Sequence, residues 1–164
     1  MCIRDRLEIA ESQALDRINR RNSFDWVKVS FTNLKEKLRL KNLERIEAFD
    51  ISHNQGSQVT ASCVCFSENG PDKKNYRSMN LSLDKNDDYL ALSEAVRRRL
   101  KNLEDNKKSL PDLLVIDGGK GQLNSVFNEL EKNGFKEINL ISISKGPLRN
   151  EKYDEIHLKN SPYK

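Results

Sequence analysis

The order of the hydrophobic patterns is the feature that most constrains this fold. Three segments, residues 45–52, 59–66 and 75–83, alternate apolar and polar side chains or run apolar, and polar turn residues separate them. Their short connections predict an antiparallel meander. Residues 84–105 then repeat apolar side chains at helical spacing, which predicts an amphipathic helix. The face of this helix that we expect to be buried carries Leu90, Leu92, Val96, Leu100 and Leu103.

A strand, a glycine-rich turn and a second helix follow. Residues 113–116 are almost entirely apolar, as in strands buried within parallel sheets, and the helical pattern after the turn ends at Gly134. Residues 138–146 repeat the buried-strand pattern, so we expect a right-handed β-α-β unit, with 155–158 as a candidate for a further short strand. The sequence therefore predicts an α/β fold, a mixed five-stranded sheet in which an antiparallel meander precedes parallel strands, flanked by helices.

The first 44 residues differ in character from the rest. They are rich in charged side chains and contain neither glycine nor proline. Apolar residues at helical spacing within 33–44 favour a helix or a helix with a linker, whereas residues 24–31 fit a short extended segment. We therefore divide the chain into a helical or linker segment, 1–33, and a folded domain, 34–164.

Length and composition limit the class of protein. A chain of 164 residues, 36% of them hydrophobic, has material for one modest core. Its three cysteines fit neither a disulfide framework nor zinc-ligand spacing, which predicts a reducing, cytoplasmic setting. No apolar run approaches the roughly 20 residues that cross a bilayer, so we expect no membrane partner. A net charge of +4 with clustered arginines permits a phosphate-binding face without establishing one.

Two aspartates stand at positions where a carboxylate is costly. Asp50 lies within an apolar strand pattern, and Asp117 ends the most apolar strand. A buried, unpaired carboxylate needs a cation, hydrogen-bond donors or a proton, although either residue alone could equally cap a turn. The first strand of the meander and the strand after the first helix can lie side by side and parallel, which would bring both side chains together. Facing carboxylates suit Mg²⁺ or Mn²⁺ and phosphodiester hydrolysis.

A third acid and a histidine could join this pair. Asp88 heads the predicted helix and could point back over the edge of the sheet; Asp87 is the alternative, and one of the two is expected to cap the helix. His53 could contact a phosphate or a metal-bound water, although loop histidines are more often incidental. His157 lies in a strand-like segment, where core packing explains it better.

Candidate phosphate ligands follow two of the predicted strands. The turn at residues 117–122, DGGKGQ, lets the backbone approach a ligand at a helix N-terminus and makes Lys120 and Gln122 candidates. It lacks the spacing of a P-loop, so as a nucleotide-binding signature it is weak. Lys145 and Arg149 follow the last clear strand and could bind DNA phosphate at the same edge, with simple solvation as the alternative.

Taken together, these motifs resemble a known family. In order and spacing they are similar to the catalytic half of UvrC, a component of the UvrABC excinuclease, over about residues 34–158. The matching segments are RIEAFDISHNQG (45–56), VTASCVCFSENGP (59–71), Tyr76 with Arg77, DDY (87–89), LPDLLVIDGGKGQLN (110–124) and ISISKG (141–146).

The resemblance implies an RNase H-like domain that makes the 5′ incision in bacterial nucleotide excision repair. By motif position, Mg²⁺ or Mn²⁺ would be held by Asp50, Asp88 and Asp117, so Asp88 is preferred over Asp87. The implied partners are damaged double-stranded DNA and UvrB, with UvrA upstream, and no small-molecule substrate.

Some family features find no match in this sequence. The resemblance places a catalytic histidine in a later D-E-x-H-R-F-like helix and adds a helix-hairpin-helix pair, a GIY-YIG domain and a UvrB-contacting segment. We therefore expect a fragment that is weak or inactive by itself. Two alternatives stay open: an endonuclease V-like nuclease, whose motif wording differs, and a non-catalytic DNA- or protein-binding module whose acids cap helices.

Overall fold

A mixed β-sheet forms the centre of the domain. The structure is a computed structural model that describes residues 25–53, 59–81, 87–145 and 154–159, and within these residues the sheet has seven strands. The strands are β1 (Arg45–His53), β2 (Val59–Ser67), β3 (Gly70–Pro71), β4 (Arg77–Leu81), β5 (Leu113–Asp117), β6 (Asn139–Ser144) and β7 (Glu155–Lys159).

The strand order confirms the predicted meander and parallel unit. β1 pairs antiparallel with β2 and parallel with β5, and β5 pairs parallel with β6. β3 and β4 both pair antiparallel with β2, while β7 returns antiparallel along β6. The sheet has two more strands than the five predicted, because β3 is too short to show an alternating pattern and the short β7 is only a candidate in the sequence.

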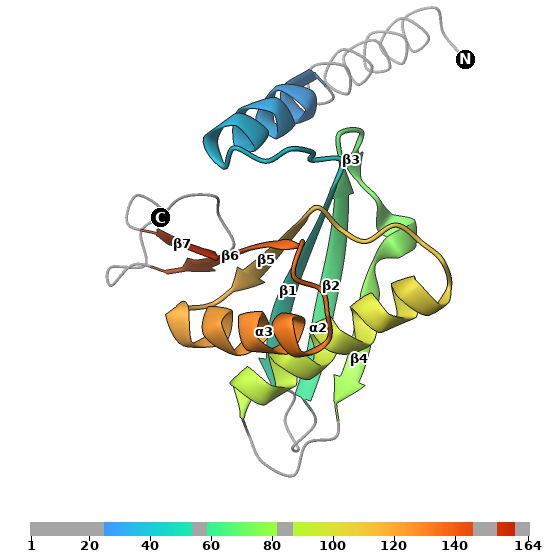
Figure 1. Cartoon of the computed structure of the whole chain (residues 1–164), viewed down its shortest axis with the longest axis vertical. Coiled ribbons are helices and arrows are strands. Elements are labelled where there is room, and N and C mark those ends of the chain that lie inside the picture. The colour runs from blue at the N-terminus through green and yellow to red at the C-terminus, as the bar shows by residue number, and fades with distance from the viewer. Residues whose placement is uncertain (1–24, 54–58, 82–86, 146–153, 160–164) are drawn as a thin grey trace, which may run out of the picture.

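Two helices cover one face of this sheet (Figure 1). α2 (Asp88–Asp105) and α3 (Lys120–Lys132) pack against each other, and a short 3₁₀ turn, η1 (Lys73–Asn75), precedes β4. The main core lies between these helices and the strands. Its members from α2 include Leu92, Val96, Leu100 and Leu103, as predicted. Leu90, two residues before Leu92 and so on the opposite side of the helix, is instead exposed.

The segment expected to be extended at residues 24–31 is helical wherever it is described. Residues 25–37 form a helix that lies near one end of the sheet (Figure 1). The alternation that suggested a strand coexists with apolar residues at helical spacing, Val27, Phe31, Leu34 and Leu38, and these pack in a second core with residues of β1, β5 and β6. No helix in the described part of the chain is long and apolar enough to cross a membrane.

Candidate active site

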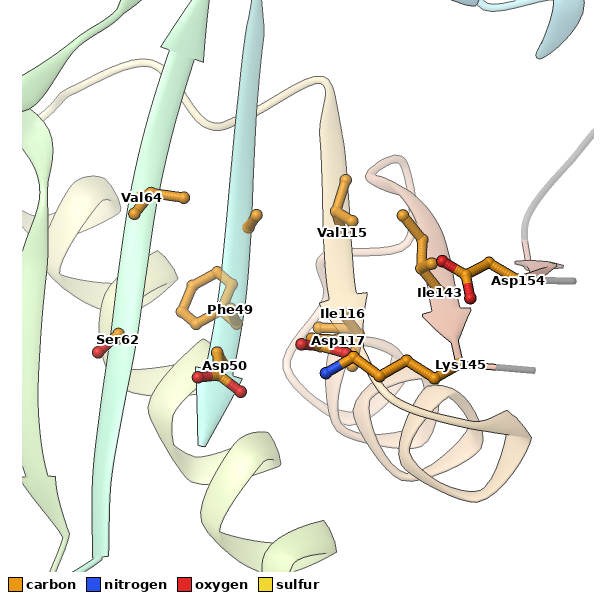
Figure 2. A pocket seen from close by; sticks show the side chains of 11 residues that line it. Phe49, Asp50, Ser62, Val64, Val115, Ile116, Asp117, Ile143, Lys145 and Asp154 are labelled. Atoms are coloured by element: carbon orange, nitrogen blue, oxygen red, sulfur yellow. The ribbon is translucent and has the colours of Figure 1, made fainter. Parts of the chain in front are cut away.

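Asp50 and Asp117 lie on neighbouring parallel strands, β1 and β5, at the point where the pairing of these two strands ends. The register pairs Phe49 with Ile116, and the two aspartates are the next residue on each strand. Side chains that are level on paired strands point to the same face of a sheet. Both carboxylates are exposed, on the face opposite α2 and α3, and both line one pocket of about 330 Å³ (Figure 2).

This pocket combines an apolar floor with a charged rim. The floor consists of the small and branched side chains that alternate with core residues along the central strands. The rim carries the two aspartates with Lys145 and Asp154 (Figure 2). The apolar floor residues are Ala48, Val64, Val115 and Ile143. Carboxylates beside a lysine offer oxygen ligands for a cation together with a positive group for a phosphate.

The remaining predicted acid lies apart from this pair. Asp88 Oδ1 is 2.6 Å from His53 Nε2, and both side chains are about half exposed. His53 follows Asp50 by three residues, so its side chain points to the opposite face of β1, toward α2. Asp88 is not among the residues that line the pocket of Asp50 and Asp117.

Helix capping distinguishes the two neighbouring acids at the start of α2. Asp87 is the N-cap residue, and its Oδ1 accepts hydrogen bonds from the backbone N–H groups of Tyr89 and Leu90, at 3.0 and 3.2 Å. The capping role therefore falls to Asp87, which leaves the carboxylate of Asp88 available for another partner. Within the described ranges, no three His, Cys, Asp or Glu side chains are grouped so that they could hold a metal ion.

The glycine-rich turn positions α3 directly after Asp117. The Gln122 side chain accepts a hydrogen bond from the backbone N–H of Gly119 at 2.8 Å and so caps the helix. A Cβ atom at Gly118 would overlap Gln122 Oε1, so this cap requires a glycine there. Lys120 begins α3 with an exposed side chain. Phosphate binding by Lys120 and Gln122 remains a prediction.

Other predicted residues differ in their surroundings. Lys145 reaches the rim of the pocket, as expected for a residue after β6, whereas Arg149 lies outside the described residues. His157 is half-buried, with Nε2 3.1 Å from Ser144 Oγ, and is not among the residues that line the pocket. Its local packing fits the structural explanation.

Two acidic residues, one on the rim of the pocket and one in the core, were missed from the sequence. Asp154 joins the rim because β7 returns along β6, and nothing in its local sequence marks it. Glu47 could have been noticed, because it shares the core-facing side of β1 with Phe49 and Ile51, where a carboxylate is unusual.

Comparisons with known protein sequences show the family of this chain. The family model described as the UvrC RNase H endonuclease domain matches residues 35–163. UvrABC system protein C of Legionella pneumophila (strain Paris) is 44% identical over 136 residues, covering 82% of this chain and 22% of the relative. The protein of the same name from Nitrosococcus oceani is 47% identical over 121 residues, covering 73% of this chain and 20% of the relative.

Two solved structures share the fold of this chain. Human endonuclease V aligns with a TM-score of 0.50 and 17% identity, covering 64% of this chain and 47% of that chain. The catalytic domain of the same human enzyme aligns with a TM-score of 0.50 and 15% identity, covering 71% of this chain and 57% of that chain. These likenesses confirm the RNase H-like α/β fold. The chain spans about a fifth of the length of the curated relatives it matches, and the match to the family model over most of its residues shows that it belongs to the UvrC family of RNase H endonuclease domains.

Proposed function

We propose that this domain hydrolyses a phosphodiester bond of damaged double-stranded DNA with Mg²⁺ or Mn²⁺, as the 5′-incising part of the UvrABC system. The observation that carries the proposal is the placement of Asp50 and Asp117 on adjacent parallel strands at the rim of one pocket. Relatives named UvrABC system protein C support the pathway. UvrB is the proposed direct partner, with UvrA acting earlier.

The residues present fit a hard divalent cation. Asp50 and Asp117 are exposed carboxylates on one rim, which would leave coordination positions open for water and a DNA phosphate. When bound, the cation would lower the pKa of an attacking water and stabilise the negative charge that builds on the phosphate. Asp88 remains a predicted third ligand, and it would join the others only if its carboxylate left His53.

The basic groups around the pocket would hold the DNA backbone. Lys145 lies on the same rim as both aspartates, so its ammonium group can bind the phosphate next to the one that is cut. Lys120, at the N-terminus of α3, would add a second contact where the helix dipole favours an anion. His53 and Arg149 are further proposed contacts. The apolar floor would keep water away from one side of the reacting group.

Incision assays with the full UvrABC system test this proposal. We expect Asp50→Asn and Asp117→Asn, introduced into the full-length protein that carries this domain, to abolish the 5′ cut in a duplex with a bulky lesion. The matched control is Asp105→Asn, because Asp105 is an exposed carboxylate at the far end of α2. Asp88→Asn, assayed in parallel, reports whether the third acid is needed.

The same assay separates the alternatives. Cleavage of an inosine-containing duplex without UvrB, in preference to the bulky lesion, would indicate an endonuclease V-like activity. Full 5′ incision by the Asp50→Asn, Asp117→Asn double variant would contradict the proposal and favour a binding module whose acids are structural.

A further inference from the structure

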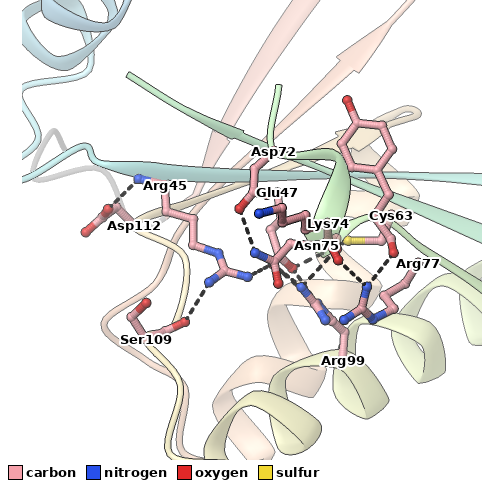
Figure 3. Close-up of polar contacts among 11 residues, drawn as sticks. Arg45, Glu47, Cys63, Asp72, Lys74, Asn75, Arg77, Arg99, Ser109 and Asp112 are labelled. Atoms are coloured by element: carbon pink, nitrogen blue, oxygen red, sulfur yellow. Dashed lines mark hydrogen bonds and ion pairs between the residues drawn. The ribbon is translucent and has the colours of Figure 1, made fainter. Parts of the chain in front are cut away.

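A buried ion pair joins α2 to β1 away from the pocket (Figure 3). Arg99 Nε lies 3.0 Å from one oxygen of Glu47 and Arg99 Nη2 lies 2.8 Å from the other, so the contact is bidentate. Glu47 is 0% and Arg99 3% exposed. Arg45 and the Cys63 thiol also donate to the Glu47 carboxylate, and Arg99 Nη2 donates to the backbone carbonyl of Asn75 at 3.2 Å.

The same helix and strand are joined a second time at the active-site end. Asp88 pairs with His53, and Arg99 pairs with Glu47, so α2 runs antiparallel to β1. Arg99 follows Asp88 by eleven residues, which is close to three helical turns and leaves both side chains on one face, about 16 Å apart along the axis. From Glu47 to His53 the strand advances about 20 Å, a comparable distance.

Apolar packing contributes to this alignment but has no preferred direction of its own. The buried positions of α2 include two alanines, Ala91 and Ala95, beside larger aliphatic side chains such as Leu92 and Leu100. Hydrophobic contacts have no direction, whereas a bidentate guanidinium-carboxylate pair has one favourable geometry. A shift of α2 by one turn, about 5.4 Å, would break this pair and also separate Asp88 from His53.

We infer that Glu47 and Arg99 are positioning residues, which set the register of α2 on β1 and thereby place Asp88 beside His53. Neither residue touches the pocket, so their effect on cleavage passes through the position of α2. This inference rests on the proposed nuclease site for its functional consequence, but the register itself can be measured without any activity.

A distance measurement between α2 and β1 tests the register directly. We would place spin labels at two exposed positions, Lys101→Cys on α2 and Ser52→Cys on β1, with Cys2→Ser to remove another thiol. Cys63 and Cys65 are buried and should escape labelling. We expect one narrow distance distribution in the parent, and a distribution that is shifted or broadened by several ångströms in the Glu47→Met, Arg99→Met double variant.

Activity of the same double variant tests the consequence. In the full-length protein we expect kcat for 5′ incision to fall at least tenfold, while the domain still binds Mn²⁺ because Asp50 and Asp117 lie on β1 and β5. The control is Arg98→Met, which removes an exposed pair with Glu94 inside α2 and should leave distance and kcat unaltered. If the double variant does not fold, Arg99→Lys replaces it, because lysine keeps the positive charge but cannot make the bidentate contact of a guanidinium group.

Two results would overturn the inference: an unchanged distance distribution in the folded variant, or parent-level incision by a variant whose α2 has moved. Failure of the proposed function is a separate outcome, because it would show as absent Mn²⁺ binding or absent incision in the parent protein.

Discussion

Removing Arg99 alone should destabilise the domain far more than removing any exposed arginine of the same helix. Glu47 would stay fully buried and lose its hydrogen bonds from Arg99, the shortest of which are 2.8 and 3.0 Å. Breaking one side of a buried pair costs about 3 to 5 kcal/mol. Because Arg45 and the Cys63 thiol still donate to the carboxylate, we expect Arg99→Met to fall at the lower end, about 3 kcal/mol.

Urea unfolding followed by circular dichroism measures this loss. The control Arg98→Met removes a pair whose arginine is 49% exposed and should cost at most about 0.5 kcal/mol. The Glu47→Met, Arg99→Met double variant should recover most of the loss, because it leaves no buried charge without a partner. Equal losses for Arg99→Met and Arg98→Met, or a double variant less stable than Arg99→Met, would refute the reasoning.

Three further perturbations follow from single contacts. Burial raises the pKa of Glu47, but Arg99 and Arg45 outweigh burial and hold that pKa below its usual range. The stability that Glu47 contributes is therefore present above about pH 4.3 and is lost as the pH falls through the lowered pKa. Glu47→Gln should flatten this acid dependence in thermal unfolding. Gly118→Ala should displace the Gln122 cap and cost up to about 1 kcal/mol in urea unfolding, but almost nothing in a Gln122→Ala background; equal costs in both backgrounds would exclude this cause. Lys145→Ala should weaken DNA binding at all sequences and reduce the salt slope by about one, as measured by fluorescence anisotropy at several salt concentrations.

The fold could be predicted where one pattern had one structural meaning. Alternation gave the main strands of the meander, and helical spacing identified α2. Residues 25–31 were wrongly assigned to an extended segment because their apolar and polar residues alternate locally. The longer series of apolar residues from Val27 to Leu38 has helical spacing and identifies the helix. The two-residue β3 was missed because its pairing depends on β2 rather than on its own residues.

The candidate site was predictable in part for a similar reason. Asp50 and Asp117 could be paired because the carboxyl ends of adjacent parallel strands share an edge. The position of Asp88 could not be deduced, because it depends on the direction of α2 and on the side of β1 to which His53 points. The partner of Glu47 could not be deduced either, because Arg99 lies 52 residues further along the chain, on another element.

The central claim is that Asp50 and Asp117 share one divalent cation. A crystal structure of the domain with Mn²⁺, using the anomalous signal of the metal, tests it most directly. We predict one anomalous peak within direct coordination distance of a carboxylate oxygen from each of the two residues, and its loss in the Asp50→Asn, Asp117→Asn variant. A peak bound to neither aspartate, or one that persists in the double variant, would contradict the account.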